Sequence, residues 1–389
     1  MTIISDEKIR QIHAALSSRQ AEIEKFVQEL VELESPSGDE TGSREVVAAL
    51  VSAAERLNCI TSIEKVDVDK FGRHVLIRAF QDEKPGQLLV VGHTDTVHAR
   101  GSVRRRPWRR EAGKIFGPGI FDMKGNCALA IEVFRTLEEL KIEPQRGVAL
   151  ILTCDEEVGS MSGWPFIERV ARSSETAFAM VLEPPASGGR VKTGRKGTGI
   201  FTLKVEGRAA HAGLEPEKGA SAILELARQT ERIHSINKAG AGITVNVGVV
   251  RGGTRSNVVP AEAEAEIDVR FSNEREAEEI EQFLLNLRPI DERTRVFVSG
   301  GINRPPLERT PAVVSLFEKA RSIAKVVNFD LGDAQVGGAS DGNFLAALGI
   351  PVLDGLGING DGAHADHENI VAADIPIRGT LIAGLIASA

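Results

Sequence analysis

The sequence has few cysteines and no long hydrophobic run. Only three of its 389 residues are cysteine, and Cys59, Cys127 and Cys154 form no C-x-x-C pair and cannot all be bridged. This pattern predicts buried thiols in a reducing compartment rather than a disulfide framework. The longest apolar runs, such as "VALILT" and "AFAMVL", are far shorter than the roughly 20 residues that cross a bilayer. We therefore expect no membrane span.

The sequence also lacks an excess of basic residues. Its formal net charge is -8, which argues against nonspecific nucleic-acid binding, because phosphate backbones favour basic protein faces. The start, "MTIISDEKIRQIHAALSSRQ", carries acids and polar residues where a secretory signal needs a basic start and an apolar block. We expect a cytoplasmic protein. One segment, "RGSVRRRPWRREAGK" at 100–114, is locally basic, and it is either a solvated surface or a docking site for an anion.

What is present describes an ordinary globular protein. Hydrophobic residues at 42%, charged residues at 26%, and 39 glycines beside only 16 prolines exclude a disordered chain or a fibrous repeat and indicate many tight loops. The chain is longer than most single compact domains. We therefore predict two domains.

The two ends of the sequence predict an α/β domain. Helical spacing of apolar residues begins at Ser5 and continues to about Leu33. Strand-like runs then alternate with helices: "QLLVVGH" precedes "NCALAIEVFRTLEEL", "GVALILT" precedes "GWPFIERVARS", "TAFAMVLE" follows, and "FEKARSIAKVV" precedes "IPVLDGL". This alternation indicates a largely parallel sheet flanked by helices.

The middle of the chain has a different pattern. From "GIFTLKVEG" to "RVFVSGG" the predicted order is β-α-β-β-α-β, which is the order of a ferredoxin-like α+β sandwich. Because the α/β pattern resumes at Arg304, this unit is predicted to be an insertion. The expected organisation is an α/β domain of residues 1–190 and 304–389, with an inserted ferredoxin-like domain of residues 191–303.

Polar side chains follow the predicted strand ends of the α/β domain. In open α/β sheets, ligands bind outside the carboxyl ends of the strands. The candidates there, together with one in a glycine-rich loop, are His93, Asp95, Asp122, Asp155, Glu156, Glu157, Glu183 and His364. Three of these acids are adjacent in "TCDEEVGS", and ionised carboxylates near a core repel one another and lose hydration. A positive charge is therefore expected opposite them.

A metal centre explains this convergence. Imidazole and carboxylate ligands without a thiolate suit a catalytic Zn²⁺, Mn²⁺ or Co²⁺ ion. Five ligands of this kind, two of them histidines and the others carboxylates, exceed what one catalytic ion needs. They are enough for two ions about 3.5 to 4 Å apart. His93 and Asp95 are two residues apart, so Asp95 can accept the second ring N–H of His93. Glu156 and Glu157 should point in different directions, so that one holds metal and the other acts as general base. Taken singly, each motif is also explained by a turn or a helix cap.

The sequence resembles a family of dinuclear zinc enzymes that includes glutamate carboxypeptidases, aminoacylases, acetylornithine deacetylases and succinyl-diaminopimelate desuccinylases. The matching segments are "GHTDTV", "GPGIFDMKG", "DEEVGS", "LEPP", "GRAAHAG", "SNVVPAEAEAEIDVR", "GGASDG" and "GAHADHE". They occur in the family's order and cover most of the chain. The resemblance, most marked to glutamate carboxypeptidases, implies a metal-binding α/β domain, an inserted lid and a homodimer formed through that lid.

The resemblance also implies roles for the residues at the sheet edge. His93 and Glu183 would complete one metal site, Glu157 and His364 the other, with Asp122 bridging two ions, for which zinc is expected and manganese or cobalt are alternatives. Glu156 would be the general base and Asp95 the orienting acid. The ligand in "HADHE" would be its first histidine, His364, with His367 as the alternative.

In the inserted domain, His211 of "GRAAHAG" resembles the histidine that reaches the substrate carbonyl in relatives, often from the other subunit, where it would stabilise an oxyanion. The alternative is a histidine that packs the lid. Four further residues resemble substrate contacts of relatives: Asn257, Arg270, Arg304 and Lys192. Gly338 in "GGASDG" either offers a backbone N–H to the substrate or belongs to a tight turn.

Together these features predict a hydrolase of amide bonds. The favoured activity is release of a carboxyl-terminal amino acid, with glutamate as the candidate, from small peptides or N-acyl amino acids. An aminoacylase or deacetylase is the nearest alternative. A non-catalytic metal- or peptide-binding protein would be expected to have lost a ligand or the base, and none is missing. A two-metal phosphoesterase would need cationic clamps, for which only the Arg-rich segment at 100–110 offers support.

Overall fold

The computed structural model describes residues 4–81, 84–237 and 242–389, and the chain divides into two compact units. The α/β unit comprises Met1–Thr193, Arg309–Val336 and Ser340–Ala389, and the inserted unit comprises Gly194–Glu308 and Gly337–Ala339. Relative to the sequence-based boundaries, residues 191–193 belong to the α/β unit, whereas residues 304–308 and 337–339 belong to the inserted unit.

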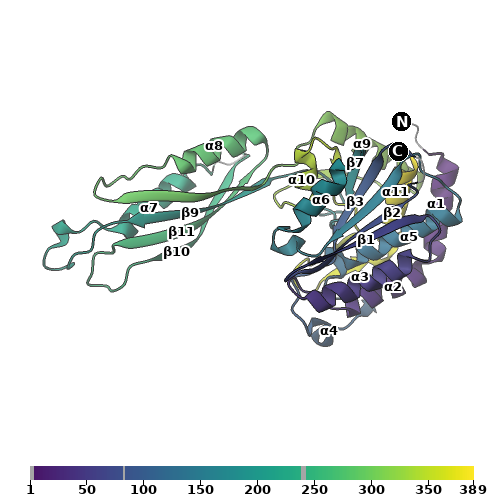
Figure 1. Cartoon of the computed structure of the whole chain (residues 1–389), viewed down its shortest axis with the longest axis horizontal. Helices are drawn as coiled ribbons and strands as arrows, with labels where there is room; N and C mark the ends of the chain where they lie inside the picture. The colour runs from purple at the N-terminus through teal and green to yellow at the C-terminus, as the bar shows by residue number, and fades with distance from the viewer. Residues whose placement is uncertain (1–3, 82–83, 238–241) are drawn as a thin grey trace. The chain divides into compact units, whose positions relative to one another are not determined.

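A six-stranded sheet of order β1-β2-β6-β3-β7-β14 forms the centre of the α/β unit. Its strands are β1 Ile60–Val68, β2 Gly72–Ala79, β3 Gln87–His93, β6 Gly147–Thr153, β7 Thr176–Val181 and β14 Val352–Leu353. The last four pair in parallel, whereas β1 and β2 form an antiparallel hairpin on β6 (Figure 1). The sheet is thus mixed but mostly parallel, and the predicted α/β class is confirmed.

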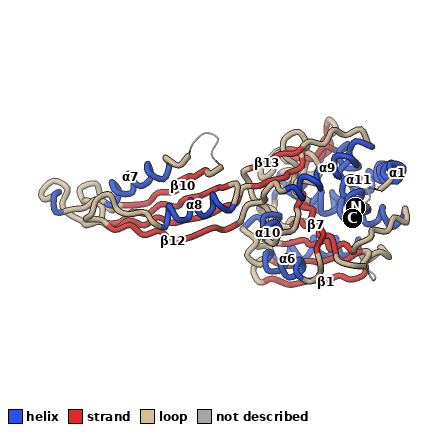
Figure 2. The backbone as a smooth tube through the Cα atoms, turned by 90° about the horizontal axis from the view of Figure 1, so that it is seen from above, coloured by secondary structure: helices blue, strands red, loops and turns tan. Residues whose placement is uncertain are grey.

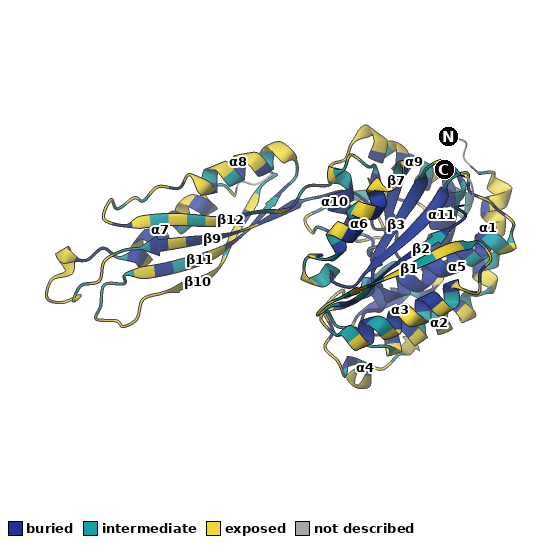
Figure 3. Ribbon diagram, in the orientation of Figure 1, coloured by how far each residue is buried: buried dark blue, intermediate teal, exposed yellow. Residues whose placement is uncertain are grey.

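Helices cover this sheet. In the described part of the α/β unit, the helices of eight or more residues are α1 Asp6–Ser18, α2 Gln20–Glu32, α3 Glu40–Ala54, α5 Gly125–Glu139, α6 Gly163–Arg172, α9 Pro311–Val326 and α11 Ile375–Ala387, and the shorter ones are α4 Ser102–Arg105 and α10 Gly342–Ala347. Every residue of β3 and β6 is buried, so both faces of the sheet are covered at these central strands (Figures 2 and 3). Because β3 and β6 are buried on both faces, their sequences are apolar along most of their length and do not alternate with polar residues.

The prediction of one continuous helix from Ser5 to Leu33 was wrong in one respect. The segment forms two helices, α1 and α2, separated at Arg19. The hydroxyls of Ser17 and Ser18 donate to the carbonyls of His13 and Ala15. Serine side chains that bond to nearby backbone compete with helical continuation, which explains the break.

The inserted unit is a four-stranded antiparallel sheet of order β10-β11-β9-β12. Its elements are β9 Gly197–Glu206, α7 Ala222–His234, β10 Thr244–Gly252, β11 Glu262–Phe271, α8 Glu274–Leu285 and β12 Arg295–Arg304, so the predicted β-α-β-β-α-β order is confirmed. Burial alternates along β11, with Ala, Ile, Val and Phe inside and acidic residues outside (Figure 3). This period of two is typical of a sheet with one covered face.

Short strands and turns complete the chain. One small sheet joins β15 Gly360–Asp361, β16 Asn369–Val371, β5 Lys114–Phe116 and β4 Arg109–Glu111, and another joins β13 Asp333–Val336 to β8 Val191–Arg195. The short helical turns in the described residues are η1 Ile120–Lys124, η2 Glu156–Val158, η3 Pro216–Lys218 and η4 Ala372–Asp374. None of the helices in the described part of the chain has the length and hydrophobicity that a bilayer-spanning segment requires.

Candidate metal centre

Neighbouring parallel strands bring the candidate residues to one edge of the central sheet. His93 is the last residue of β3 and lies opposite Thr153, the last residue of β6. On the other side of β3, Val91 lies opposite Val181, two residues before Glu183. The segments that follow β3, β6 and β7 therefore begin at one level, as predicted from the direction of the strands.

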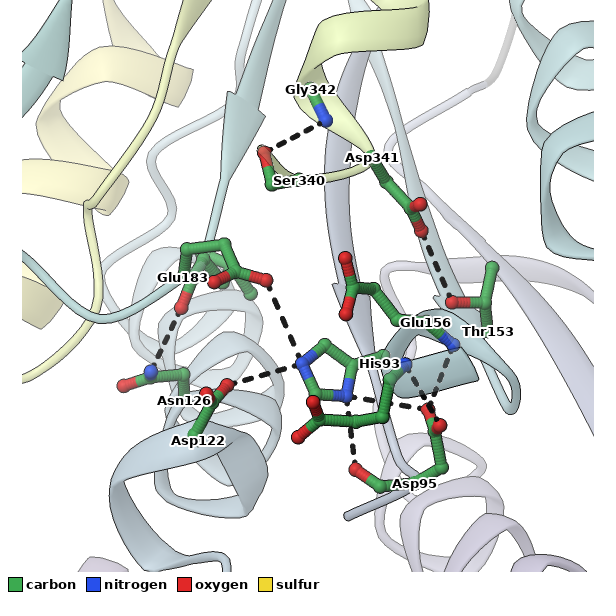
Figure 4. Close-up of polar contacts among 12 residues, drawn as sticks. His93, Asp95, Asp122, Asn126, Thr153, Glu156, Glu183, Ser340, Asp341 and Gly342 are labelled. Carbon is green, nitrogen blue, oxygen red and sulfur yellow. Dashed lines mark hydrogen bonds and ion pairs between the residues drawn. The ribbon is translucent and has the colours of Figure 1, made fainter. Parts of the chain in front are cut away.

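Asp122 lies between two histidines. Its Oδ1 is 3.2 Å from His93 Nε2, which is also 3.6 Å from Glu183 Oε1 (Figure 4). Its Oδ2 is 3.4 Å from His364 Nε2, which is also 3.1 Å from Glu157 Oε2. One carboxylate thus faces two His–Glu pairs. The structure brings together all five residues that the sequence analysis named as ligands.

Ligand atoms in this cluster are close enough to share a cation. Those of His93, Asp122 and Glu157 lie within 4.8 Å of one another, and so do those of His93, Glu156 and Glu183. The second group includes Glu156, which the sequence analysis named as a base and not as a ligand. In addition, Glu157 Oε1 is buried and has no hydrogen-bond partner among the described residues. Because a buried carboxylate oxygen without a partner is costly, this donor set fits divalent cations.

The pKa values of Asp122 and of three groups around it are strongly shifted. Burial is the main cause that raises the pKa of Glu157 to about 8. The hydrogen bond with Asp122 raises the pKa of His364 to about 9. Burial opposes the charged forms of Asp122 and His93, but their mutual hydrogen bond and further ones outweigh it, so the pKa of Asp122 is lowered and that of His93 is raised. Protons thus balance the carboxylates in the protein alone, and cations would displace them.

Asp95 links His93 to the η2 turn. His93 Nδ1 is 3.0 Å from the backbone oxygen of Asp95 and 3.3 Å from its Oδ1. The two carboxylate oxygens of Asp95 accept the backbone N–H groups of Glu156 and Glu157, each at 3.2 Å, and Oδ2 also accepts from Ser37 Oγ at 2.7 Å. Burial opposes ionisation of Asp95, but the hydrogen bond from His93 and the others lower its pKa. Of these contacts of Asp95, only the one with His93 was predicted from the sequence.

Two further acids hold the η2 turn in place. Asp155 accepts the N–H and the hydroxyl of Ser162, both at 2.7 Å, at the start of α6, which fits a structural role for this first acid of "DEE". Asp341 accepts from Thr153 Oγ1 at 3.3 Å (Figure 4) and from Ser160 Oγ. Asp341 thus holds the chain on both sides of Glu156. Sequence reasoning gave Asp341 no role, and its position in "SDG" before a short helix was the available signal.

The first predicted substrate contacts lie at the ends of β8 and β12 and in the loop after β13. Lys192 is buried and exchanges backbone hydrogen bonds with Asp354 at 2.7 and 3.1 Å. It belongs to the α/β unit and not, as predicted, to the insertion. Arg304 is buried at the end of β12. Gly338 is exposed, and its carbonyl accepts from Arg195 Nη1 at 3.1 Å.

The remaining predicted contacts belong to the inserted unit. His211 is exposed, and its Nδ1 accepts the backbone N–H groups of residues 213 and 214, both at 3.1 Å. Because Nδ1 is an acceptor, Nε2 carries the proton and is a donor. Asn257 is exposed, and its backbone carbonyl accepts the N–H of residue 212 at 3.0 Å. Arg270 makes two contacts with Asp268, at 2.8 and 2.9 Å, a pairing that the sequence analysis did not include.

Two alternatives from the sequence can now be compared with the geometry. His367 is exposed, and its Nε2 is 3.8 Å from Asp361 Oδ2, whereas His364 faces the carboxylate cluster. In the Arg-rich segment, Arg100 pairs with Asp39, Arg106 with Asp366 at 3.0 Å, and Arg110 with Glu24 at 3.4 Å. These arginines bind the protein's own acids, which weakens the reading of the segment as an anion-docking site.

The chain was compared with known proteins. It matches the model of Peptidase family M20/M25/M40 over residues 89–388. It is 26% identical to carboxypeptidase G2 of Pseudomonas sp. strain RS-16, over 99% of this chain and 93% of that protein. It is 29% identical to the succinyl-diaminopimelate desuccinylase of Alkalilimnicola ehrlichii, over 76% of this chain and 82% of that protein. The crystal structure of aminopeptidase PepT from Bacillus cereus superposes with a TM-score of 0.77 at 21% identity, covering 95% of this chain and 98% of that chain.

The family model spans both units of the chain and includes the carboxylate and histidine cluster. The likeness to carboxypeptidase G2 extends over nearly the whole length of both proteins. The chain therefore belongs to Peptidase family M20/M25/M40 and is a dinuclear metallo-hydrolase of that family.

Proposed function

We propose that this enzyme is a zinc-dependent carboxypeptidase that releases a carboxyl-terminal amino acid, with glutamate favoured, from short peptides or N-acyl amino acids. The observation that carries the proposal is the position of Asp122, whose two oxygens face His93 and His364 separately. The likeness to carboxypeptidase G2 over 99% of the chain supports the direction of cleavage.

We assign the ligands of two ions from these contacts. Asp122, His93 and Glu183 would hold one ion, and Asp122, His364 and Glu157 would hold the other. Nitrogen and oxygen donors without thiolate suit zinc, and also manganese or cobalt. When bound, two such ions polarise the scissile carbonyl and lower the pKa of the attacking water.

Glu156 is proposed to move the proton. Its backbone N–H is fixed by Asp95, so the turn that carries it cannot shift without breaking that bond. Its carboxylate takes a proton from the attacking water and returns it to the leaving amine, which is the work of a general base and then a general acid. His211 is proposed to donate its Nε2–H to the oxyanion, and its tautomer supports this, because Nδ1 already accepts two backbone N–H groups.

The substrate carboxylate requires cationic and hydrogen-bonding partners. We propose Arg270, Arg304, Lys192, Asn257 and Gly338 for this purpose. An arginine binds a carboxylate through two parallel hydrogen bonds. The pair that Arg270 forms with Asp268 already has this geometry, so a substrate carboxylate would take the same two donors in exchange for Asp268.

We also propose a homodimer formed through the inserted unit. Large hydrophobic side chains that are exposed in the described part of the chain lie mostly there: Ile200, Leu214, Ile223, Leu224, Val249, Val250, Leu285, Ile290 and Phe297, against Val97, Val158 and Met161 in the α/β unit. The sheet of the inserted unit also ends in two edge strands, β10 and β12. Exposed apolar side chains and open edges are typical of a surface that another chain covers.

A substrate panel tests the proposal. Enzyme loaded with zinc, manganese or cobalt is assayed with peptidyl and N-acyl amino acids that differ in the terminal residue, each with a free and an amidated carboxyl end. We expect kcat/KM to be highest for terminal glutamate and to fall at least about a hundredfold on amidation, because an amide cannot accept the two parallel charge-assisted hydrogen bonds that an arginine donates to a carboxylate. Preference for small acyl groups would favour a deacylase, the function suggested by the likeness to the desuccinylase. Hydrolysis of phosphoesters alone would contradict both.

A further inference from the structure

We propose that Glu368 is a positioning residue of the metal centre, and that Arg106 of the basic segment holds it through His98. The proposal rests on the proposed function, because the centre that these residues order is the one assigned above. It gives a role to part of "RRRPWRR", which the reaction itself does not use.

Glu368 holds the loop that carries the bridging carboxylate. The side chain is almost completely buried, with 2% exposure, just before β16. Its Oε2 accepts the N–H of Gly119 at 2.7 Å, and its Oε1 accepts those of Phe121 and Asp122 at 2.9 and 3.0 Å. Hydrogen bonds to an ionised acceptor are about twice as strong as neutral ones. The backbone of Asp122 is therefore fixed directly by Glu368.

The same segment carries His364. Between them, the N–H of Ala365 donates to Gly362 and that of Glu368 donates to Ala365, at 2.9 and 3.3 Å. His364 has a φ of 64°, in the left-handed region that non-glycine residues seldom adopt, so its position depends on the contacts of this turn. Glu368 thus connects a ligand of one ion to the carboxylate that bridges both.

His98 and Arg106 fix the carboxylate from its far side. His98 Nε2 contacts Glu368 Oε2, and His98 Nδ1 is 3.2 Å from Arg106 Nη2. A guanidinium can only donate, so Nδ1 accepts and Nε2–H donates to Glu368. Nη1 of the same guanidinium is 3.0 Å from Asp366 Oδ1 and donates to the carbonyl of Ala365 at 3.3 Å. Arg106 therefore holds both the orienting histidine and the backbone beside His364.

The inserted unit offers a matched control. Glu225 has 1% exposure and accepts the N–H groups of Ile290 and Asp291 at 2.8 and 3.0 Å. Like Glu368, it is a buried carboxylate that holds a loop through backbone N–H groups. The loop that Glu225 holds carries none of the proposed metal ligands. Loss of either acid should disturb folding in a similar way, and only loss of Glu368 should disturb metal binding.

The experiment compares Glu368→Gln with Glu225→Gln in the full chain. Metal affinity is measured by competition with a coloured chelator, and the cobalt-loaded proteins are compared by visible absorption. We expect Glu368→Gln to weaken metal binding by about 10- to 100-fold, as outer partners of metal ligands do, and to alter the cobalt spectrum. Glu225→Gln should change neither. A Glu368→Gln protein that binds two cobalt ions with the wild-type affinity and spectrum would overturn the proposal.

A second pair of variants applies if Glu368→Gln does not fold. Arg106→Lys keeps the charge and loses the forked contact, and Arg293→Lys is its control, because Arg293 likewise binds a carboxylate, that of Asp291, and the carbonyl of Gly219. Arg106→Lys should weaken metal binding several-fold and lower kcat without raising KM, whereas an affinity and kcat equal to those of Arg293→Lys would refute the proposal. Metal affinity and the cobalt spectrum can be measured without turnover of a substrate. An enzyme that is inactive on every substrate would therefore contradict the proposed function, whereas the metal affinities of these variants would still test the role of Glu368.

Discussion

Both units contain buried carboxylates, but the carboxylates differ in how they are satisfied. In the inserted unit, Glu225 accepts three hydrogen bonds, and the acids on the open face of β11 pair with exposed arginines such as Arg251. In the α/β unit, Glu157 Oε1 is the one carboxylate oxygen that is buried without a partner among the described residues. Because a buried carboxylate oxygen without a hydrogen-bond partner is costly, this oxygen indicates that the α/β unit is the one with room for a cation ligand.

The direction of the pKa shifts makes the same distinction. In the inserted unit, hydrogen bonds from Arg293 lower the pKa of Asp291 to about 2, which is the ordinary effect of a surface ion pair. In the α/β unit, burial raises the pKa of Glu157 to about 8 although two histidines oppose the rise. Strong shifts caused by burial cluster at functional sites. The strongly shifted carboxyl group thus lies in the α/β unit, whereas the residues that we propose in the inserted unit, His211, Arg270 and Arg304, are all hydrogen-bond donors.

The largest expected effect separates two adjacent acids of the α/β unit. Glu156→Gln should lower kcat by about 10³-fold or more, because the proposed general base is lost, and should leave two metal ions bound. Glu157→Gln should lose metal from the site shared with His364. Metal content after dialysis and kcat under saturating substrate are the measurements.

The control for this pair is Glu266→Gln in the inserted unit, an exposed acid paired with Arg251 at 2.6 Å. It should change neither metal content nor kcat. Equal loss of metal in both α/β variants would contradict the division of labour, and so would a bound-metal count unaffected by Glu157→Gln.

The next effect tests the donor that we assign to the inserted unit. His211→Ala should lower kcat by about 10²- to 10³-fold, because one donor to the oxyanion is removed, with the metal content unchanged. His234→Ala is the matched control, since His234 also accepts a backbone N–H, that of Val247 at 3.2 Å, and has no proposed part in the reaction. Loss of metal in His211→Ala would break the distinction between the units.

If the enzyme is a dimer and His211 acts on the partner subunit, two inactive variants should complement each other. Mixing His211→Ala with Glu156→Gln, followed by isolation of the heterodimer, should restore part of the wild-type activity. Heterodimers that stay as inactive as their parents would show that His211 acts within its own chain.

Sequence patterns predicted the elements that have strong local signals. The uniformly apolar β3 and β6 and the alternating β11 were recognisable because burial on two faces or on one leaves a different period in the sequence. The hairpin of β1 and β2 was missed, because the apolar residues of "ITSIEKVDV" stand at 60, 63, 66 and 68 and show no clear period of two. The break between α1 and α2 was also missed, because it depends on which serine side chains bond to the backbone.

At the site, residue types at strand ends identified the cluster, but contacts between distant segments could not be read. The second role of Asp95, as acceptor for two backbone N–H groups, depends on where the chain turns after β6. The contacts of Glu368 and Asp341 join segments more than 180 residues apart. Such pairs are visible only in the folded chain, because the local sequence around one residue does not predict which distant residue will contact it.

The smallest expected effect concerns stability after metal removal. In the metal-free α/β unit, the pKa of Glu157 is raised to about 8 and that of His364 to about 9. Both groups therefore bind protons more tightly in the folded state than in the unfolded state, where their values are near 4.5 and 6.5. Their contribution to stability is present at low pH and is lost as the pH rises toward 8 and 9.

Chelation should consequently destabilise the α/β unit more at pH 9 than at pH 6, by several degrees in Tm, whereas the inserted unit should be indifferent. Trp108 and Trp164, the two tryptophans of the chain, both belong to the α/β unit, so fluorescence follows that unit alone and circular dichroism follows both. The metal-loaded protein is the control, because its carboxylates are neutralised by cations rather than by protons. A chelated protein whose fluorescence Tm is flat or rises between pH 6 and pH 9 would show that protons do not take the place of the cations, and the electrostatic difference between the units would then need another cause.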